Sequence, residues 1–174
     1  MGINMAEKKP LENNNAVKLT KITSEELFSI AEIMFDQGKP VLLTVTGNSM
    51  YPFLRHGVDR VEICRAGMRD IKVADIALIR RDGGAYVLHR VFKKNETEFY
   101  MVGDAQNYLD GPYNTFHLIG KVVSIYRGDR HIPCSSLRLR FLVRLWMLMR
   151  PVRLPIIKGY TKLRGGKGKK AITT

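Results

Sequence analysis

Cysteine is scarce in this sequence. Only Cys64 and Cys134 occur, with no CxxC pair and no cluster of histidines and cysteines. A disulfide framework needs several cysteines, and a structural zinc site needs paired His or Cys ligands at short spacing. The sequence therefore indicates neither, and we expect no metal, no cofactor and a buried apolar role for each thiol.

Long apolar runs are missing from the N-terminal part. Residues 1–17 are polar and rich in Asn, Lys and Glu, and nothing ahead of Val41 resembles a signal peptide. A membrane-spanning helix needs about 20 apolar residues, which this part lacks. We expect a disordered arm over residues 1–22 and a cytoplasmic protein without a transmembrane anchor, peripheral at most at the inner membrane face.

Acidic residues are few. The 174 residues include 29 Lys and Arg against 16 Asp and Glu, and the resulting net charge of +13 is concentrated beyond Arg138. Such an asymmetry favours an anionic contact near the C-terminus, namely phospholipid head groups, nucleic acid or an acidic protein. The length and the 45% hydrophobic fraction fit one domain with a core plus tails.

One helix and six strands are predicted ahead of the tail. A capping box at Thr23 and Glu26 opens an amphipathic helix that ends before Pro40 and should pack on the domain. Strands are then predicted over residues 41–45, 60–64, 75–81, 86–94, 98–102 and 118–127. The fold class is therefore mainly β, with coiled antiparallel sheets in a domain over residues 23–134.

A serine stands where the first strand breaks. Ser49 follows a Gly-Asn turn signal and precedes Pro52 by three positions. A nucleophilic serine needs such a fixed backbone with an exposed hydroxyl, although turn closure by Ser49 is the alternative. His89 lies within an apolar strand, and Asp104 and Asp110 lie in a polar loop. Each alone is typical of a core histidine or of turn-forming aspartates, whereas together with Ser49 they can supply a base and its orienting carboxylate.

Five motifs occur in the order found in the signal peptidase I family. They are GNSMYP at 47–52, ADIAL at 74–78, VLHRV at 87–91, GDA at 103–105 leading to Asp110, and IGKV at 119–122. The sequence resembles that family, and more broadly the group that it forms with the LexA-like self-cleaving proteases. The resemblance covers about residues 41–127. His89 stands where the bacterial branch has lysine, as in the archaeal and endoplasmic-reticulum branch.

This resemblance implies a serine endopeptidase that cleaves an extended peptide or precursor protein after small residues. By the same resemblance Ser49 is the nucleophile and its backbone amide an oxyanion donor, while His89 is the general base. Asp110 would be the third member, and Asp104 would support the loop. Part of the family has a serine where Gly47 stands, so the second oxyanion donor stays open. A self-cleaving regulator and a non-catalytic peptide-binding module of the same fold are the alternatives.

The C-terminal stretch over residues 135–174 is predicted as a basic amphipathic helix and tail. Arginines interrupt its apolar residues, so the apolar run is too short to span a bilayer. An interfacial helix with Phe141, Leu145 and Trp146 in the head-group boundary, followed by a Gly/Lys run over 158–170, would bind an anionic membrane surface. The alternative is a helix packed on the domain. Nucleic-acid binding is not favoured, because interleaved aromatics and a reading helix are missing.

Overall fold

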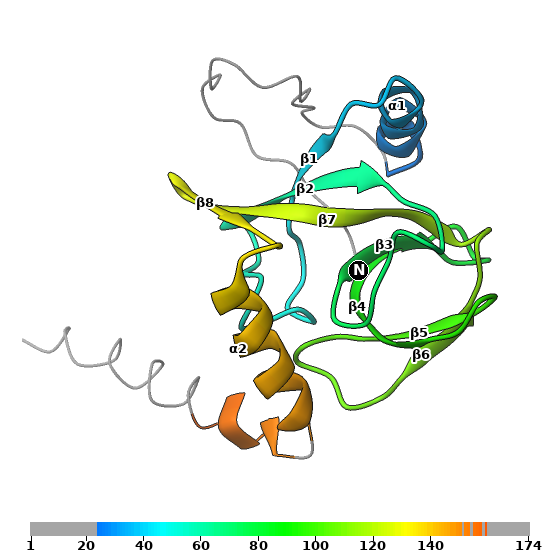
Figure 1. Cartoon of the computed structure of the whole chain (residues 1–174). Helices are drawn as coiled ribbons and strands as arrows, with labels where there is room; N and C mark the ends of the chain where they lie inside the picture. The colour runs from blue at the N-terminus through cyan, green and yellow to red at the C-terminus, as the bar shows by residue number, and fades with distance from the viewer. Residues whose placement is uncertain (1–23, 151, 154, 158, 160–174) are drawn as a thin grey trace, which may run out of the picture.

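The computed structural model describes residues 24–150, 152–153, 155–157 and 159, with side chains from Phe28 onward (Figure 1). The predicted arm, Thr23 of the capping box and most of the Gly/Lys run lie outside these residues, and the Glu26 side chain is not among those described. The elements are α1 (Ser24–Asp36), β1 (Val41–Thr44), β2 (Asp59–Arg65), β3 (Ile76–Arg80), β4 (Tyr86–Lys94), β5 (Phe99–Val102), β6 (Asp110–Tyr113), β7 (Leu118–Arg127), β8 (Arg130–Pro133) and α2 (Leu137–Leu148).

The strands form one antiparallel sheet of eight strands. Its order is β1-β2-β7-β3-β4-β5-β6, and β8 pairs with β7. The long β7 joins two parts of the sheet, because it pairs with β2 along one edge over residues 120–127 and with β3 along the other edge over residues 118–121. Register shifts interrupt the pairs β2–β7, β3–β7, β4–β5 and β5–β6. Such bulges bend strands, and Figure 1 shows β3 to β6 curling round on themselves.

Two apolar clusters make up the core. The first joins the inner face of α1, where Phe28 and Ala31 are buried, to residues of β1, β2 and β7. The second fills the curl between β3, β4, β5 and β7 around Phe99 and Met101. The predicted packing of α1 on the domain is confirmed, since its apolar stripe is part of the first cluster.

The mainly β fold class is confirmed, and all six predicted strands are present. Two further strands, β6 and β8, were missed. The sequence of β6 is DGPY and that of β8 is RHIP, so neither has the β-branched pattern that marks a strand. Both lie at a sheet edge, where proline is tolerated because no partner needs its missing N–H group.

Helix α2 packs beside the loop between β5 and β6, and one face of it is buried through Val143. Its partly buried Leu139 contacts the first apolar cluster. Among the described residues no helix is long and apolar enough to cross a membrane.

Candidate active site

The turn that carries Ser49 is held at both ends by backbone hydrogen bonds. Val45 N donates to Asp59 O at 2.9 Å, and Gly57 N donates to Val45 O at 2.8 Å. Gly47 has a φ of 81°, a conformation that glycine adopts without strain. Met50, directly after the serine, is buried in the first apolar cluster. The chain therefore leaves β1 in a fixed turn that positions Ser49.

The side chain of His89 lies next to Ser49. Strand β4 places this histidine opposite Ala77 of β3, and only 2% of it is exposed. Its Nε2 is 3.0 Å from Ser49 Oγ, which is a normal hydrogen-bond distance. Burial lowers the pKa of His89 from 6.5 to about 4; nearby Asp110 acts to raise it, and Arg81 acts to lower it. The imidazole is therefore neutral near pH 7, and Nε2 can accept the hydroxyl proton.

Asp110 lies on the other side of the His89 ring. Its Oδ2 is 3.6 Å from His89 Nδ1, beyond hydrogen-bond length, and this buried Nδ1 has no hydrogen-bond partner among the described residues. Asp110 instead accepts hydrogen bonds from Tyr113 Oη at 2.6 Å and from Arg81 Nη2. Burial acts to raise the pKa of Asp110, but the bonds from Tyr113 and Arg81 outweigh it and leave the pKa lowered. Asp110 is therefore a carboxylate near pH 7.

Asp104 is fully buried and is paired with a different side chain. Arg90 Nε donates to its Oδ1 at 2.8 Å and Arg90 Nη2 to its Oδ2 at 2.6 Å, a two-pronged arrangement. The third nitrogen of the same guanidinium, Nη1, donates to Ala74 O at 2.7 Å. Asp104 thus joins the β5–β6 loop to β4 and to the segment before β3, and it makes no hydrogen bond to His89.

The loop that begins with Gly103 lies directly against the serine turn. Ala105 N donates to Ser49 O at 2.8 Å. A Cβ atom on Gly103 would lie 2.7 Å from the same carbonyl oxygen, so only glycine fits there. Trp146 Nε1 donates to Asp104 O at 3.0 Å, and Arg153 Nη2 donates to Gly103 O at 3.1 Å. The β5–β6 loop is therefore held between the serine turn and α2 with the segment that follows it.

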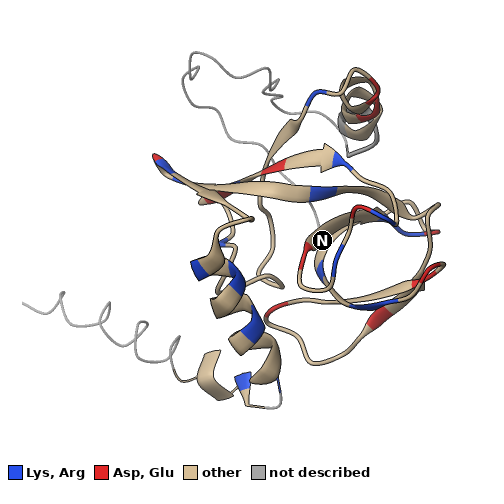
Figure 2. Cartoon of the chain, viewed as in Figure 1, with Lys and Arg blue, Asp and Glu red and all other residues tan. Residues whose placement is uncertain are grey.

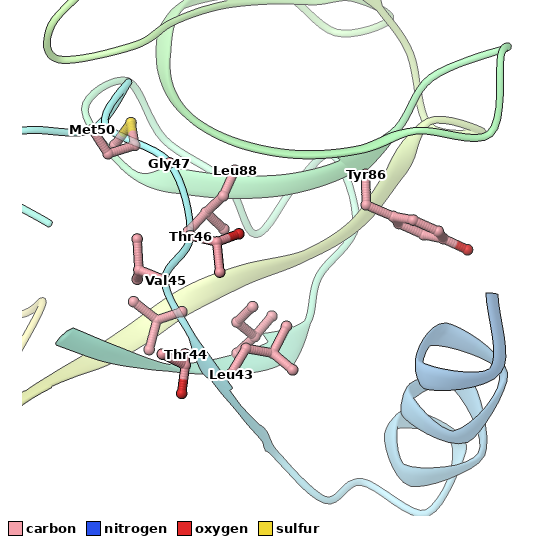
Figure 3. Close-up of a pocket in the computed structure, with 10 residues that line it drawn as sticks. Leu43, Thr44, Val45, Thr46, Gly47, Met50, Tyr86 and Leu88 are labelled. Carbon is pink, nitrogen blue, oxygen red and sulfur yellow. The ribbon is translucent and has the colours of Figure 1, made fainter. Parts of the chain in front are cut away.

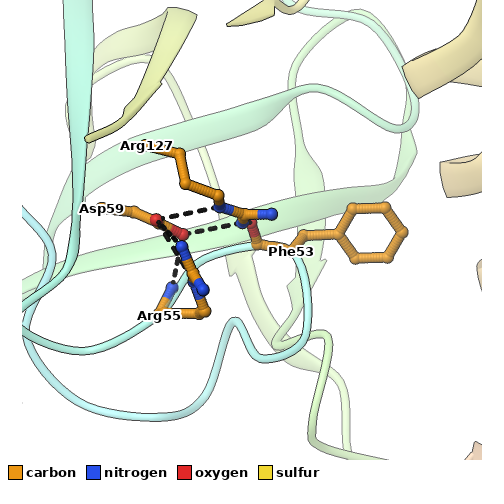
Figure 4. A network of polar contacts seen from close by, with 4 residues as sticks. All are labelled: Phe53, Arg55, Asp59 and Arg127. Carbon is orange, nitrogen blue, oxygen red and sulfur yellow. Dashed lines mark hydrogen bonds and ion pairs between the residues drawn. The ribbon is translucent and has the colours of Figure 1, made fainter. Parts of the chain in front are cut away.

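A second set of ionic contacts holds the segment that follows the serine turn (Figure 4). Asp59 of β2 is fully buried and accepts from Arg55 N at 2.9 Å and from Arg127 Nη2 at 2.8 Å. Arg127 Nη2 also donates to Phe53 O at 2.8 Å. Burial acts to raise the pKa of Asp59, but the hydrogen bonds from Arg127 and Arg55 prevail and lower it.

A small apolar cavity of about 20 Å³ borders the serine turn (Figure 3). It is lined by residues of β1, β2 and β4 and by the turn itself, namely Leu43, Thr44, Val45, Thr46, Gly47, Met50, Val61, Ile63, Tyr86 and Leu88. The buried hydroxyl of Thr46 has no hydrogen-bond partner among the described residues. A cavity of this size has room for a methyl group or one water molecule.

The structure brings Ser49, His89 and Asp110 together and places Asp104 apart from them, in its pair with Arg90. Sequence reasoning missed Arg81 and Tyr113, which bind Asp110. Arg81 gives no local signal, because it lies 29 positions before Asp110 in the sequence, whereas Tyr113 lies only three positions after it. The described part of the chain has no group of three or more His, Cys, Asp or Glu that could hold a metal ion.

The comparisons with known proteins give one match. The family model described as Peptidase S24-like matches residues 13–123, a range that includes the serine turn, β4 with its histidine and the loop before β6. No curated protein and no solved structure matches the chain.

Proposed function

The chain belongs to the Peptidase S24-like family, and from this membership we propose that it is a serine endopeptidase acting through Ser49, His89 and Asp110. The observation that carries the proposal is the 3.0 Å contact between Ser49 Oγ and Nε2 of a buried, neutral histidine. A nucleophile and a base within hydrogen-bond reach are the minimum for acyl transfer.

The first half of the proposed reaction forms an acyl-enzyme. His89 Nε2 takes the hydroxyl proton while Ser49 Oγ attacks the peptide carbonyl carbon, and the carbonyl oxygen becomes an oxyanion facing the Ser49 amide. The C–N bond then breaks as His89 returns the proton to the leaving amine. In the second half, water gives a proton to His89 and attacks the ester carbonyl carbon. The bond to Ser49 Oγ then breaks as His89 returns that proton to Oγ, which releases the acid and restores the serine.

Asp110 is the proposed partner of the imidazolium that forms at each proton transfer. Its carboxylate lies 3.6 Å from His89 Nδ1, and catalytic hydrogen bonds that are long in a resting enzyme often shorten when substrate binds. Asp104 is proposed to support the loop, since both of its oxygens are taken by Arg90.

The proposed substrate is an extended peptide with small side chains next to the scissile bond. Among the described residues, strand β1, which leads into the serine turn, pairs on one side only, with β2. An extended peptide can add to such an edge through backbone hydrogen bonds. The cavity of about 20 Å³ beside the turn would accept a methyl-sized group and exclude a large one.

A fluorophosphonate probe tests the nucleophile, because it reacts only with an activated serine. We expect labelling at Ser49 that is lost in Ser49→Ala and reduced by at least about 100-fold in His89→Gln. Ser135→Ala, which removes an exposed serine elsewhere, should label like the wild type. Equal labelling of the His89 variant and the wild type would contradict the proposal.

Incubating the purified chain alone separates the protease from a self-cleaving regulator. A protease acting on other peptides leaves its own chain intact, as mass spectrometry would show. A regulator instead cuts itself at a rate that does not depend on protein concentration. A module without catalysis shows neither probe labelling nor self-cleavage.

A further inference from the structure

Helix α2 is fixed to the domain by one face. Val143 is buried, and Trp146 donates its indole N–H to Asp104 O while its ring meets Phe53 edge-on at 6.1 Å. Trp146, which was expected from the sequence at a lipid boundary, is partly buried and makes these contacts with the domain. These contacts set the rotation of α2 about its axis, and they decide which residues face outward.

The outward face of α2 carries a row of apolar side chains, here called the outer stripe. It consists of Leu137, Phe141, Leu145 and Leu148, which are 81%, 68%, 45% and 79% exposed. Spacings of four, four and three residues align them along one side of a helix. Burying this row on the same domain would require α2 to give up the contacts of Val143 and Trp146. An exposed apolar row of this length is typical of an interaction surface.

Positive charge surrounds the outer stripe. Arg138, Arg140 and Arg144 of α2 are all exposed, and α2 carries no acidic residue (Figure 2). The sequence from residue 130 to residue 174 contains twelve Lys and Arg and no Asp or Glu. An occupant of the outer stripe must therefore combine an apolar interior with a negative rim or surface.

We propose that α2 docks on an anionic phospholipid bilayer, lying in the plane of the interface with the outer stripe in the acyl boundary. Arginines next to the stripe can extend their guanidinium groups to the phosphates while their methylene stems stay in the apolar layer. Nucleic acid matches the charge but leaves the outer stripe in water. An anionic bilayer satisfies both features at once, and this proposal does not depend on proteolytic activity.

Vesicle flotation of the full chain tests the docking. We expect binding to vesicles of phosphatidylcholine with phosphatidylglycerol, little binding to phosphatidylcholine alone, and weakening by salt. The double variant Phe141→Ser with Leu148→Ser should weaken binding by about 30-fold or more, because it removes two apolar anchors. Phe116→Ser, at an 89% exposed phenylalanine between β6 and β7, is the matched control and should bind like the wild type.

A charge variant tests the electrostatic part of the proposed membrane binding. Arg138→Gln with Arg144→Gln should weaken binding by about tenfold or more and flatten its salt dependence, because each surface cation contributes on the order of fivefold. Arg69→Gln with Lys93→Gln removes the same charge from exposed positions outside α2 and should change binding less.

Three results would overturn the proposal. The first is a full chain that stays in solution with anionic vesicles at low salt. The second is unchanged binding of both the Phe141/Leu148 variant and a second pair, Leu137→Ser with Leu145→Ser, which would show that charge alone attracts the chain. The third is a dimer that the serine variants convert to monomers without any lipid binding, which would assign the outer stripe to a second copy.

Discussion

His89 lies 3.0 Å from Ser49 through Nε2 and 3.6 Å from Asp110 through Nδ1. The nucleophile and the base are therefore at hydrogen-bond distance, whereas the base and the carboxylate are slightly too far apart for a hydrogen bond. Arg81 and Tyr113 hold Asp110 in its present position. The charged residues near the site have different partners, so single substitutions can distinguish their roles.

Exchanging each loop aspartate for asparagine should give opposite results. Asp110→Asn should lower peptide cleavage by about 10²–10⁴-fold, because an amide cannot stabilise the imidazolium. Its effect on unfolding should stay within about 1 kcal/mol, since the partner Arg81 is 40% exposed. Asp104→Asn should destabilise the fold by about 3–5 kcal/mol, because it leaves the charge of buried Arg90 uncompensated. Urea unfolding and a cleavage assay on both variants check this, and the reverse pattern would reassign the two carboxylates.

The pH dependence of kcat/KM should report the buried base. Since the pKa of His89 is lowered to about 4, activity should be present above that pH and should fall as the pH drops through it. Arg81 lowers this pKa and Asp110 raises it. Arg81→Gln should therefore move the acidic limb to higher pH, and the residual activity of Asp110→Asn should show a limb at lower pH. Shifts of both variants in the same direction would contradict this assignment.

Stability should also depend on pH through His89. The unfolded chain binds a proton at this histidine below about pH 6.5, whereas the folded chain binds it only below about pH 4. The free energy of unfolding should therefore fall as the pH is lowered through this window, by about 3 kcal/mol from this one group. His89→Gln lacks the titration, so the difference between wild type and variant in urea unfolding should shrink toward acidic pH. A difference that is constant with pH would show that His89 is not buried in its neutral form.

Much of the fold could be predicted because its strands carry local signals. The β-branched residues of β7 and the Gly-rich turn between β3 and β4 predict these elements without tertiary information. Strand β6 has no such signal, because its Gly111 and Pro112 are tolerated only through its position at the sheet edge. Its first residue, Asp110, was for that reason expected in a loop.

The candidate site could be predicted in part. The resemblance pointed to Ser49 and His89, and the structure places them within hydrogen-bond distance. Nothing local in the sequence links Arg81 to Asp110, or Trp146 to the carbonyl of Asp104, since 29 and 42 residues separate these pairs. Contacts between residues of distant elements depend on how those elements pack, and a single sequence does not reveal that packing.

The buried carboxylate of Asp59 should be more important for stability than an exposed one. Asp59→Asn removes the charge partner of Arg127 beneath the serine turn and should destabilise the fold by about 2–3 kcal/mol. Asp36→Asn breaks the pair with Arg65, whose side chains are 71% and 58% exposed, and should change stability by less than about 0.5 kcal/mol. Because the pKa of Asp59 is lowered, its contribution should be present at neutral pH and lost as the pH falls through that lowered value. Urea unfolding at neutral and acidic pH checks both variants, and equal effects would contradict the prediction.

A single methyl group on Gly103 should damage the site through the backbone. In Gly103→Ala the new Cβ would lie 2.7 Å from Ser49 O and 2.5 Å from Gln106 Oε1, so the serine turn or the β5–β6 loop must move. We expect a destabilisation of about 1–3 kcal/mol and a marked loss of probe labelling at Ser49. Gly83→Ala adds the same methyl group where no atom lies within 4 Å, and it should leave stability and labelling nearly unchanged. If Gly103→Ala labels at the wild-type rate, the loop does not position the nucleophile, whatever its effect on the melting temperature.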